Sequence, residues 1–251
     1  MNGQNVNKEL DAYLKELHLP TVRNTYEELG RKAAGESLGY GEYLLELVRN
    51  ECEARRQRRT ERWLMESQLP LEKNLKSFEM SRLPKKVVQQ VKVLLDGSFL
   101  DRKENLLAFG NPGSGKTHLL CALGQELIQQ GRRVYCCTCS LLVQELLRGK
   151  RELRLEKLLN KLEKYEALIL DDIGYVKQDR DEMEVFFTLL AQRYERGSLM
   201  ITSNLPFSKW ETIFKDPMTT AAAIDRLIHH SVILELNVPS YRIEEAKKRK
   251  Q

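Results

Sequence analysis

Residues 110–117 read Gly110-Asn111-Pro112-Gly113-Ser114-Gly115-Lys116-Thr117, the G-x-x-x-x-G-K-T pattern of a phosphate-binding P-loop. The glycines allow a tight turn that points successive backbone N–H groups at anionic phosphates. Lys116 can reach the β- and γ-phosphates, and the Thr117 hydroxyl can ligate Mg²⁺. His118, the next residue, completes the set of residues expected to contact the nucleotide.

The sequence on either side of this loop supplies the context that a P-loop requires. Residues 104–109 contain a short apolar run, which predicts a buried strand leading into the loop. Residues 118–130 carry leucines at helical spacing and are followed by Gly131, a typical helix-ending glycine. A chance glycine-rich turn would lack this order of strand, loop and helix. The chain is therefore expected to bind a nucleoside triphosphate.

The composition of the chain bears on its cellular compartment. Its 251 residues carry a net charge of +5. No stretch approaches the roughly 18 consecutive apolar residues of a membrane span, and no signal peptide is apparent at the N-terminus. The five cysteines have no framework spacing and are expected to be reduced. These features predict a cytoplasmic protein with no membrane partner.

Two domains are predicted, with a boundary near Pro70. Residues 1–69 show helical spacing of apolar residues and predict a small all-helical domain for oligomerisation, partner or DNA contact. Residues 70–251 begin with a connector at 71–84 and a helix at about 85–95, and then alternate between strands and helices. The predicted strands are 106–109, 133–137, 167–170, 199–202 and 232–236. Five strands joined by crossover helices predict an α/β P-loop core with a parallel five-stranded sheet.

Polar residues at the ends of two later strands fit a phosphate-hydrolysing site. The apolar run 167–170 ends in Asp171 and Asp172, the Walker B pattern. Asp171 is expected to hold Mg²⁺, and Asp172 to orient or deprotonate the attacking water. Asn204 follows the strand at 199–202 and is a candidate contact to the γ-phosphate or the water. An Asn that simply favours a loop before proline is the alternative for that residue.

With these motifs the sequence resembles the AAA+ ATPases, in the initiator and helicase-loader clade that includes DnaA and DnaC, and most closely the IstB-type transposition helpers. The supporting segments are Gly110–His118, Leu168–Tyr175, Thr202–Pro206, Ala223–His230 and Ser240–Arg242. The resemblance spans essentially the whole chain. It implies ATP and Mg²⁺ as cofactors, a homo-oligomeric ring or spiral, double-stranded DNA bound without sequence choice, an IstA-type transposase as partner, and a bacterial cytoplasm.

The resemblance also implies residue roles. Asn204 matches sensor 1, and Arg226 matches the arginine finger that reaches into the ATP site of a neighbouring subunit. Arg242 is a candidate for a sensor-2-like contact. A surface arginine paired with a carboxylate is the alternative for Arg226.

Two features depart from the broader AAA+ pattern. Walker B usually ends in Asp-Glu, whereas here it ends in Asp171-Asp172. The residues after 236 are too few for the usual C-terminal helical lid, so no such domain is expected, and the connector is expected to help close the nucleotide pocket. Leu75, Phe78 or Met80 could pack on the adenine, or belong to the ordinary core.

Basic residues mark two candidate DNA-contacting segments. Within the helical insertion 141–164, four basic residues recur at helix spacing and are expected to share one DNA-binding face, with leucines on the opposite face: Lys150, Arg154, Lys157 and Lys161. A solvated face with internal Glu–Lys pairs is the alternative. The arginine-rich stretch 55–62 could contact DNA or a partner, or be a solvated helix end.

The leading functional hypothesis is an ATPase that assembles on DNA and regulates a transposase. The runner-up is a DnaC-type loader that docks on a replicative helicase, with nearly identical chemistry. A small-molecule kinase and a nucleotide-gated scaffold with negligible turnover are further alternatives.

Overall fold

The predicted strands form one parallel β-sheet in the computed structural model, which describes residues 3–173, 180–206, 209–210 and 224–248. The strands are β1 (Asn105–Gly110), β2 (Val134–Thr138), β3 (Ala167–Asp171), β4 (Ser198–Ser203) and β5 (Ser231–Leu236). Their order across the sheet is β2-β3-β4-β1-β5, and each pairing is parallel. Each strand end lies within one residue of its predicted position. The expected five-stranded α/β core is confirmed.

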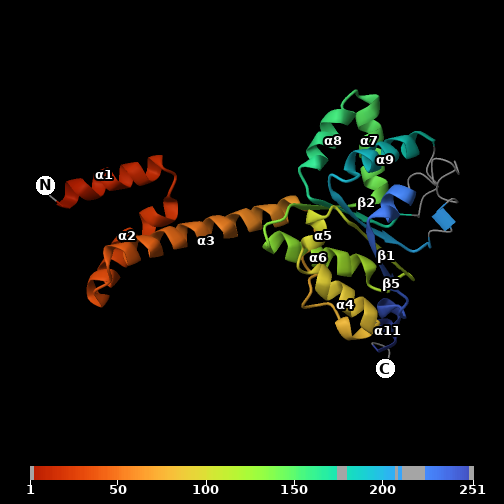
Figure 1. The fold of residues 1–251 in the computed structure, drawn as a ribbon, viewed down its shortest axis with the longest axis horizontal. Coiled ribbons are helices and arrows are strands. Elements are labelled where there is room, and N and C mark those ends of the chain that lie inside the picture. The colour runs from red at the N-terminus through yellow and green to blue at the C-terminus, as the bar shows by residue number, and fades with distance from the viewer. Residues whose placement is uncertain (1–2, 174–179, 207–208, 211–223, 249–251) are drawn as a thin grey trace. The chain divides into compact units, whose positions relative to one another are not determined.

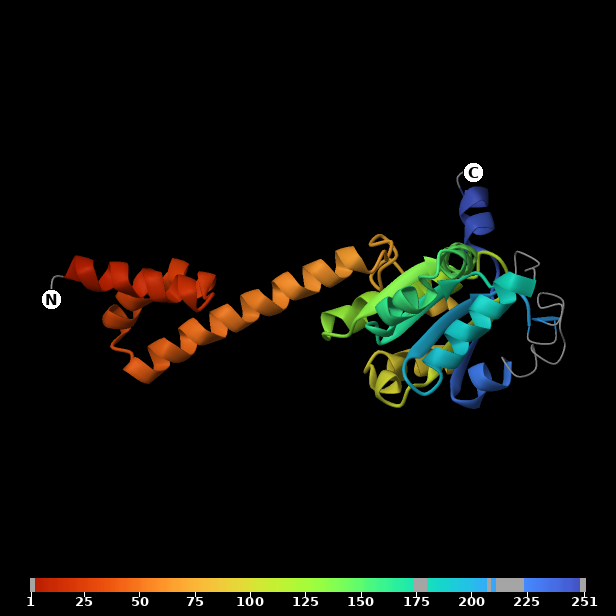
Figure 2. The same ribbon diagram turned by 90° about the horizontal axis from the view of Figure 1, so that it is seen from above.

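Each face of the sheet carries its own hydrophobic core, because side chains alternate along every strand. Leu106 and Ala108 of β1 belong to one core, and Leu107 between them belongs to the other. The first core is covered by α4 (Lys85–Leu94), α5 (Ser98–Asp101) and α6 (Lys116–Gln129). The second is covered by α7 (Cys139–Arg151), α8 (Leu155–Glu163) and α9 (Arg180–Arg193). Figure 1 shows the sheet between these two layers, and Figure 2 shows the α7–α9 layer in front of it.

Shorter elements flank this core. They are the 3₁₀ turn η1 (Met80–Arg82), a helix over residues 224–229 and α11 (Tyr241–Lys248). Among the described residues, no helix is both long and apolar enough to cross a bilayer.

The chain divides into two compact units, Met1–Arg62 and Trp63–Gln251. The first contains α1 (Gly3–Glu16), α2 (Pro20–Glu36) and most of α3 (Tyr40–Glu66). This division precedes the boundary expected between residues 69 and 70. The reason is that Trp63, Leu64 and Leu69 pack on the core beside α6, so the last turn of α3 belongs to the α/β unit.

The helical insertion differs from its prediction. α7 ends at Arg151 and α8 begins at Leu155, and between them Leu153 has a left-handed φ of 56°. Gly149 allows the close approach of α8, because a Cβ there would overlap the Leu158 side chain. The turn lets the leucines of α8 pack on the core. The single continuous helix assumed for Lys150, Arg154, Lys157 and Lys161 is therefore wrong.

A buried carboxylate holds the first unit together. Glu51 of α3 is 3% exposed. It accepts hydrogen bonds from the backbone N–H groups of Thr21 (2.7 Å) and Val22 (3.2 Å), which are unpaired donors at the start of α2. Arg55 Nε donates to the same carboxylate at 2.8 Å, and Arg58 lies 3.5 Å from it. Two arginines of the basic stretch thus contribute to the fold of their own unit.

The pKa of Glu51 makes this arrangement depend on pH. Burial acts to raise the pKa, but the hydrogen bonds from Arg55, Val22 and Thr21 outweigh it and the pKa is lowered. A lowered folded-state pKa contributes stability that is present above the unfolded-state pKa and is lost as pH falls through the folded-state value.

We expect Glu51→Ala to destabilise the first unit by about 2 kcal/mol, because two N–H groups and Arg55 lose their acceptor. Hydrogen exchange of residues 20–50 in the full chain measures this, and the stability loss of the wild type below about pH 4 should be smaller in the variant. Glu53→Ala removes an exposed carboxylate of the same helix and should change stability by less than about 0.5 kcal/mol. Equal effects of the two variants would contradict the role of Glu51.

Candidate active site

The P-loop connects the end of β1 to the start of α6 and packs on the segment that follows β5. Gly113 has a φ of 79°, in the left-handed region, and a Cβ there would overlap the Ser240 side chain. The Tyr241 N–H donates to Gly113 O at 3.0 Å. The loop conformation therefore depends on glycine and is supported by the start of α11.

Lys116 is 6% exposed and points back along the loop. Its Nζ donates to the carbonyl oxygens of Gly110 (2.8 Å) and Asn111 (2.9 Å) and to Asn204 Oδ1 (2.6 Å). Burial lowers the pKa of Lys116, while the charges of Asp172 and Asp171 act in the opposite direction. The ammonium group thus joins the P-loop to the end of β4.

Asp171 forms the second part of the site. Its Oδ1 accepts hydrogen bonds from Thr117 Oγ1 (2.7 Å) and Thr202 Oγ1 (2.6 Å). A threonine hydroxyl and a carboxylate oxygen in contact beside a phosphate loop are hard oxygen ligands, the type that Mg²⁺ requires. The chemistry of Thr117 and Asp171 therefore fits a magnesium ion, which these two side chains would hold.

Asp172 has an unusual backbone and a perturbed carboxyl group. Its φ is 67°, its N–H donates to Thr202 Oγ1 (2.8 Å), and its Oδ1 accepts from Asn204 Nδ2 (3.1 Å). Burial and then the charge of Asp171 raise the pKa of Asp172, and Lys116 partly offsets them. A raised pKa makes a carboxylate a better proton acceptor, which suits a general base.

These groups border a cavity of about 480 Å³. The connector forms one wall through Ser77 and Phe78, and α11 contributes Arg242. Of the three residues considered for adenine packing, Phe78 lines the cavity, Met80 packs on the core and Leu75 is not among the lining residues.

His118 links the connector to the P-loop helix. Its Nε2 lies 3.0 Å from Asn74 O and 3.2 Å from Ser77 Oγ, and its ring meets Phe78 edge-on with centroids 5.1 Å apart. Arg82 holds the C-terminal segment in a similar way. Its guanidinium donates to Glu244 (2.6 Å).

Comparison with known proteins agrees with this geometry. Residues 12–249 match the family described as IstB-like ATP binding protein. The chain belongs to this family. A protein of Sinorhizobium fredii named as an insertion sequence ATP-binding protein is 42% identical over 96% of this chain and 82% of its own length. The IS5376 ATP-binding protein of Geobacillus stearothermophilus is 35% identical, over 95% of each chain.

The fold agrees with that of solved AAA+ proteins. The DnaC helicase loader superposes with a TM-score of 0.54 at 20% identity, over 65% of this chain and 96% of that chain. The chain is thus a member of the IstB-like ATP-binding family with a fold similar to that of the DnaC helicase loader. Residues 174–175 and 223, which complete two of the quoted motif segments, lie outside the described residues.

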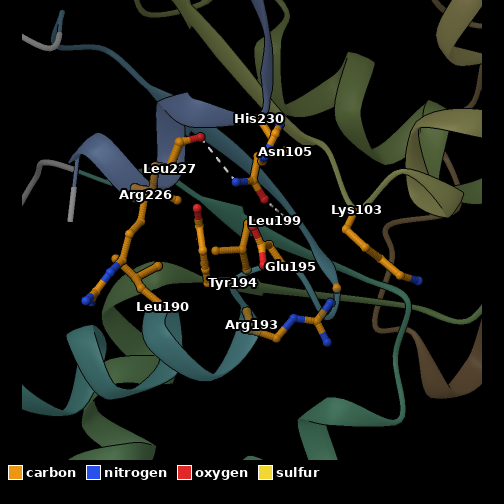
Figure 3. A pocket seen from close by; sticks show the side chains of 11 residues that line it. Lys103, Asn105, Leu190, Arg193, Tyr194, Glu195, Leu199, Arg226, Leu227 and His230 are labelled. Atoms are coloured by element: carbon orange, nitrogen blue, oxygen red, sulfur yellow. Dashed lines mark hydrogen bonds between the residues drawn. The ribbon is translucent and has the colours of Figure 1, made fainter. Parts of the chain in front are cut away.

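In this IstB-like protein, Arg226 lies at the opposite end of the sheet from the P-loop. It is exposed and lies on the helix over residues 224–229. It lines a small pocket together with Asn105, the first residue of β1, and Leu199, the second residue of β4 (Figure 3). Asn105 Nδ2 donates to Leu227 O (3.1 Å), and its Oδ1 accepts from the Leu199 N–H (2.8 Å). This bridge fixes the helix that carries Arg226. Within the described part of the chain, Arg226 has no ion pair.

The basic residues of the insertion separate into two groups. An open groove of about 880 Å³ runs along the turn between α7 and α8 and is lined by Arg154, Lys157 and Lys161. Lys150 is not among its lining residues, because its Nζ pairs with Glu184 of α9 at 2.7 Å.

Two residues in contact with the site were not predicted from the sequence. Thr202 bonds to both Walker B residues, and Arg82 fixes α11. The sequence does contain a signal for Thr202, because it is a polar residue at the end of an apolar run, in the strand that pairs with the Walker B strand. The sequence carries no comparable signal for Arg82, whose partner Glu244 is 162 residues away.

We expect Gly113→Ala to weaken ATP binding at least about tenfold, because alanine opposes the left-handed backbone and its Cβ displaces Ser240. Titration with a fluorescent ATP analogue measures this. Gly35→Ala, in α2 with no heavy atom within 4 Å of the added Cβ, is the matched control and should bind normally. Wild-type affinity in Gly113→Ala would contradict the loop geometry.

Proposed function

We propose that this protein hydrolyses ATP in an assembly on double-stranded DNA and thereby regulates a partner transposase of the IstA type. The observation that supports this most is the separation of Arg226 from the P-loop. The groups suited to hydrolysis gather at the carboxyl ends of the strands, while the arginine suited to complete them lies at the amino ends.

Hydrolysis would use the contacts already described. Lys116 would bind the β- and γ-phosphates in place of its backbone carbonyl partners, and Asn204 would remain beside both Lys116 and Asp172. Asp172 would orient the attacking water and accept its proton. A magnesium ion held by Thr117 and Asp171 would neutralise phosphate charge. Arg242, which lines the cavity from α11, would contact the phosphates as a sensor-2-like residue.

Arg226 would act on the ATP of a neighbouring subunit. The six residues of β1 separate its pocket from the P-loop by a rise of about 20 Å. An arginine side chain is much shorter than that distance, which supports a contribution in trans over one in cis. A guanidinium supplied in trans stabilises charge on the transferring phosphoryl group and makes hydrolysis conditional on assembly.

DNA would bind along the groove between α7 and α8. Arg154, Lys157 and Lys161 line it from one side of the turn. Lysine and arginine contacts of this kind go to phosphates, so binding would be salt-sensitive and independent of sequence. Lys150 pairs with Glu184 and Arg154 pairs with Glu152, which makes these two residues weaker candidates than Lys157 and Lys161.

The partner is inferred from the relatives, whose names tie them to insertion sequences. Residues 1–69 would supply the docking or oligomerisation surface, because α1 carries an exposed apolar stripe. Its members are Val6, Leu10 and Tyr13, and the exposed Leu17 follows directly after the helix. The alternative, a helicase loader, is supported by the DnaC-like fold. At 20% identity, a shared fold does not imply a shared function. Pull-down against a transposase and a replicative helicase distinguishes the two partners.

The trans mechanism is testable by mixing two inactive variants. Lys116→Ala should lose ATP binding, and Arg226→Ala should bind ATP but hydrolyse it at least about 10³-fold more slowly. In an equimolar mixture with DNA, Arg226 of one variant faces the intact ATP site of the other. We expect about a quarter of the wild-type ATPase rate for random neighbours in a closed oligomer.

A mixture no faster than the sum of its components would contradict the trans assignment. Arg196→Ala is the matched control, since Arg196 is an exposed arginine that pairs with Glu163 at 3.9 Å. It should hydrolyse ATP at the wild-type rate, alone or mixed.

The DNA groove predicts a specific salt dependence. Reversing Lys157 and Lys161 to glutamate should weaken binding to duplex DNA and reduce the slope of log K against log salt by about 2. Lys86→Glu with Lys92→Glu makes the same charge change at exposed positions of α4 and should bind more tightly than the groove variant. Equal losses in the two double variants would indicate a general charge effect and contradict the groove.

A further inference from the structure

Thr202 is a buried hydroxyl shared by both Walker B residues. It is 1% exposed and lies near the end of β4. Its Oγ1 donates to Asp171 Oδ1 at 2.6 Å and accepts the Asp172 N–H at 2.8 Å. A threonine hydroxyl has one proton to donate and lone pairs that accept. Here the proton is donated to Asp171, and one lone pair accepts the N–H of Asp172, the next residue along the chain.

The hydrogen bond from the Asp172 N–H to Thr202 lies at an energetically unfavourable backbone conformation. Asp172 has a φ of 67°, a left-handed conformation that non-glycine residues seldom adopt. The hydrogen bond from its N–H to Thr202 supports this conformation. Without the hydroxyl, the Asp172 N–H would lose its acceptor beside the buried end of the sheet.

Thr202 and Asn204 hold Asp172 from its two ends. They are two residues apart, and alternate residues along an extended chain lie on the same side. Thr202 holds the backbone N–H, and Asn204 Nδ2 donates to the carboxylate at 3.1 Å. Ser203, between them, faces elsewhere: its Oγ lies 2.8 Å from Leu205 O and 3.2 Å from Ile173 O, either of which can accept its single proton.

We propose that Thr202 is a positioning residue for hydrolysis, which fixes Asp172 through its backbone and Asp171 through its carboxylate. The proposal rests on the proposed ATPase function. It accounts for the orientation of the shorter Asp172 side chain, since the left-handed turn directs its carboxylate to Asn204.

The test compares two substitutions that differ only in the hydroxyl. Thr202→Val keeps the branched shape and removes the hydrogen bonds, and Thr202→Ser keeps the hydroxyl. We expect Thr202→Val to lower kcat about 10- to 100-fold with KM for ATP changed less than about threefold. Thr202→Ser should recover most of the rate. Ser203→Ala, which removes an equally buried neighbouring hydroxyl, should leave kcat near that of the wild type.

Two further measurements separate positioning from a loss of stability. Without nucleotide or metal, exchange of the Asp172 amide hydrogen should be faster in Thr202→Val than in the wild type and protected in Thr202→Ser. In an Asp172→Asn background, Thr202→Val should reduce the residual rate by less than it reduces the wild-type rate, because only its contact with Asp171 is then left to act on catalysis. If Thr202→Val does not fold, Thr202→Ala takes its place with the same expectations.

The outcomes distinguish a failure of the proposed ATPase function from a failure of the role proposed for Thr202. If Asp172→Asn hydrolyses ATP as fast as the wild type, the proposed function is overturned. If Asp172→Asn is slow but the Thr202 variant without the hydroxyl keeps the wild-type kcat, only the role of Thr202 is overturned. Unchanged protection of the Asp172 amide, or rate losses that add in the double variant, would overturn it as well.

Discussion

The parallel pairing of β4 with both β3 and β1 is the constraint on which the site depends. Because the three strands run in the same direction, their carboxyl ends meet at one edge. The P-loop, the Walker B carboxylates, Thr202 and Asn204 come together there, through side-chain contacts between residues that are 31 to 88 positions apart in the sequence. A slip of one residue in the β3–β4 register would turn Thr202 away from Asp171 and separate the polar network.

Burying the charged groups of the site costs free energy, which the rest of the α/β unit must offset. Burial lowers the pKa of Lys116 and raises that of Asp172, so both shifts disfavour the charged forms. Their mutual attraction offsets only part of this effect. The hydrogen bonds through Asn204 and Thr202 keep these groups in place without a ligand. A triphosphate beside Lys116 would favour the charged form of Lys116, so its binding would offset part of the free-energy cost of burial.

The sequence predicted the elements that local chemistry determines, and failed where distant packing decides. Glycine spacing and apolar runs located the P-loop and every strand to within one residue. The break at Leu153 was missed because leucine gives no local signal for a left-handed turn; the turn arises from packing of α8 on the core. The division of the compact units between Arg62 and Trp63 has no local signal in the sequence, because helix periodicity continues through Glu66 while the packing partner changes. Arg82 and Glu244 could not be paired from a single sequence.

Arg226 is held at the end of the sheet opposite to the P-loop of its own chain. The Asn105 bridge attaches its helix to the amino ends of β1 and β4, so the rigidity of the sheet holds Arg226 away from the P-loop of the same chain. No side-chain motion overcomes a separation of about 20 Å along a strand. The same sheet that assembles the carboxylates therefore sends the arginine to the opposite end. If that arginine completes the site, ATP turnover depends on contact between subunits, and a surface that organises subunits, such as DNA, controls the chemistry without touching the nucleotide.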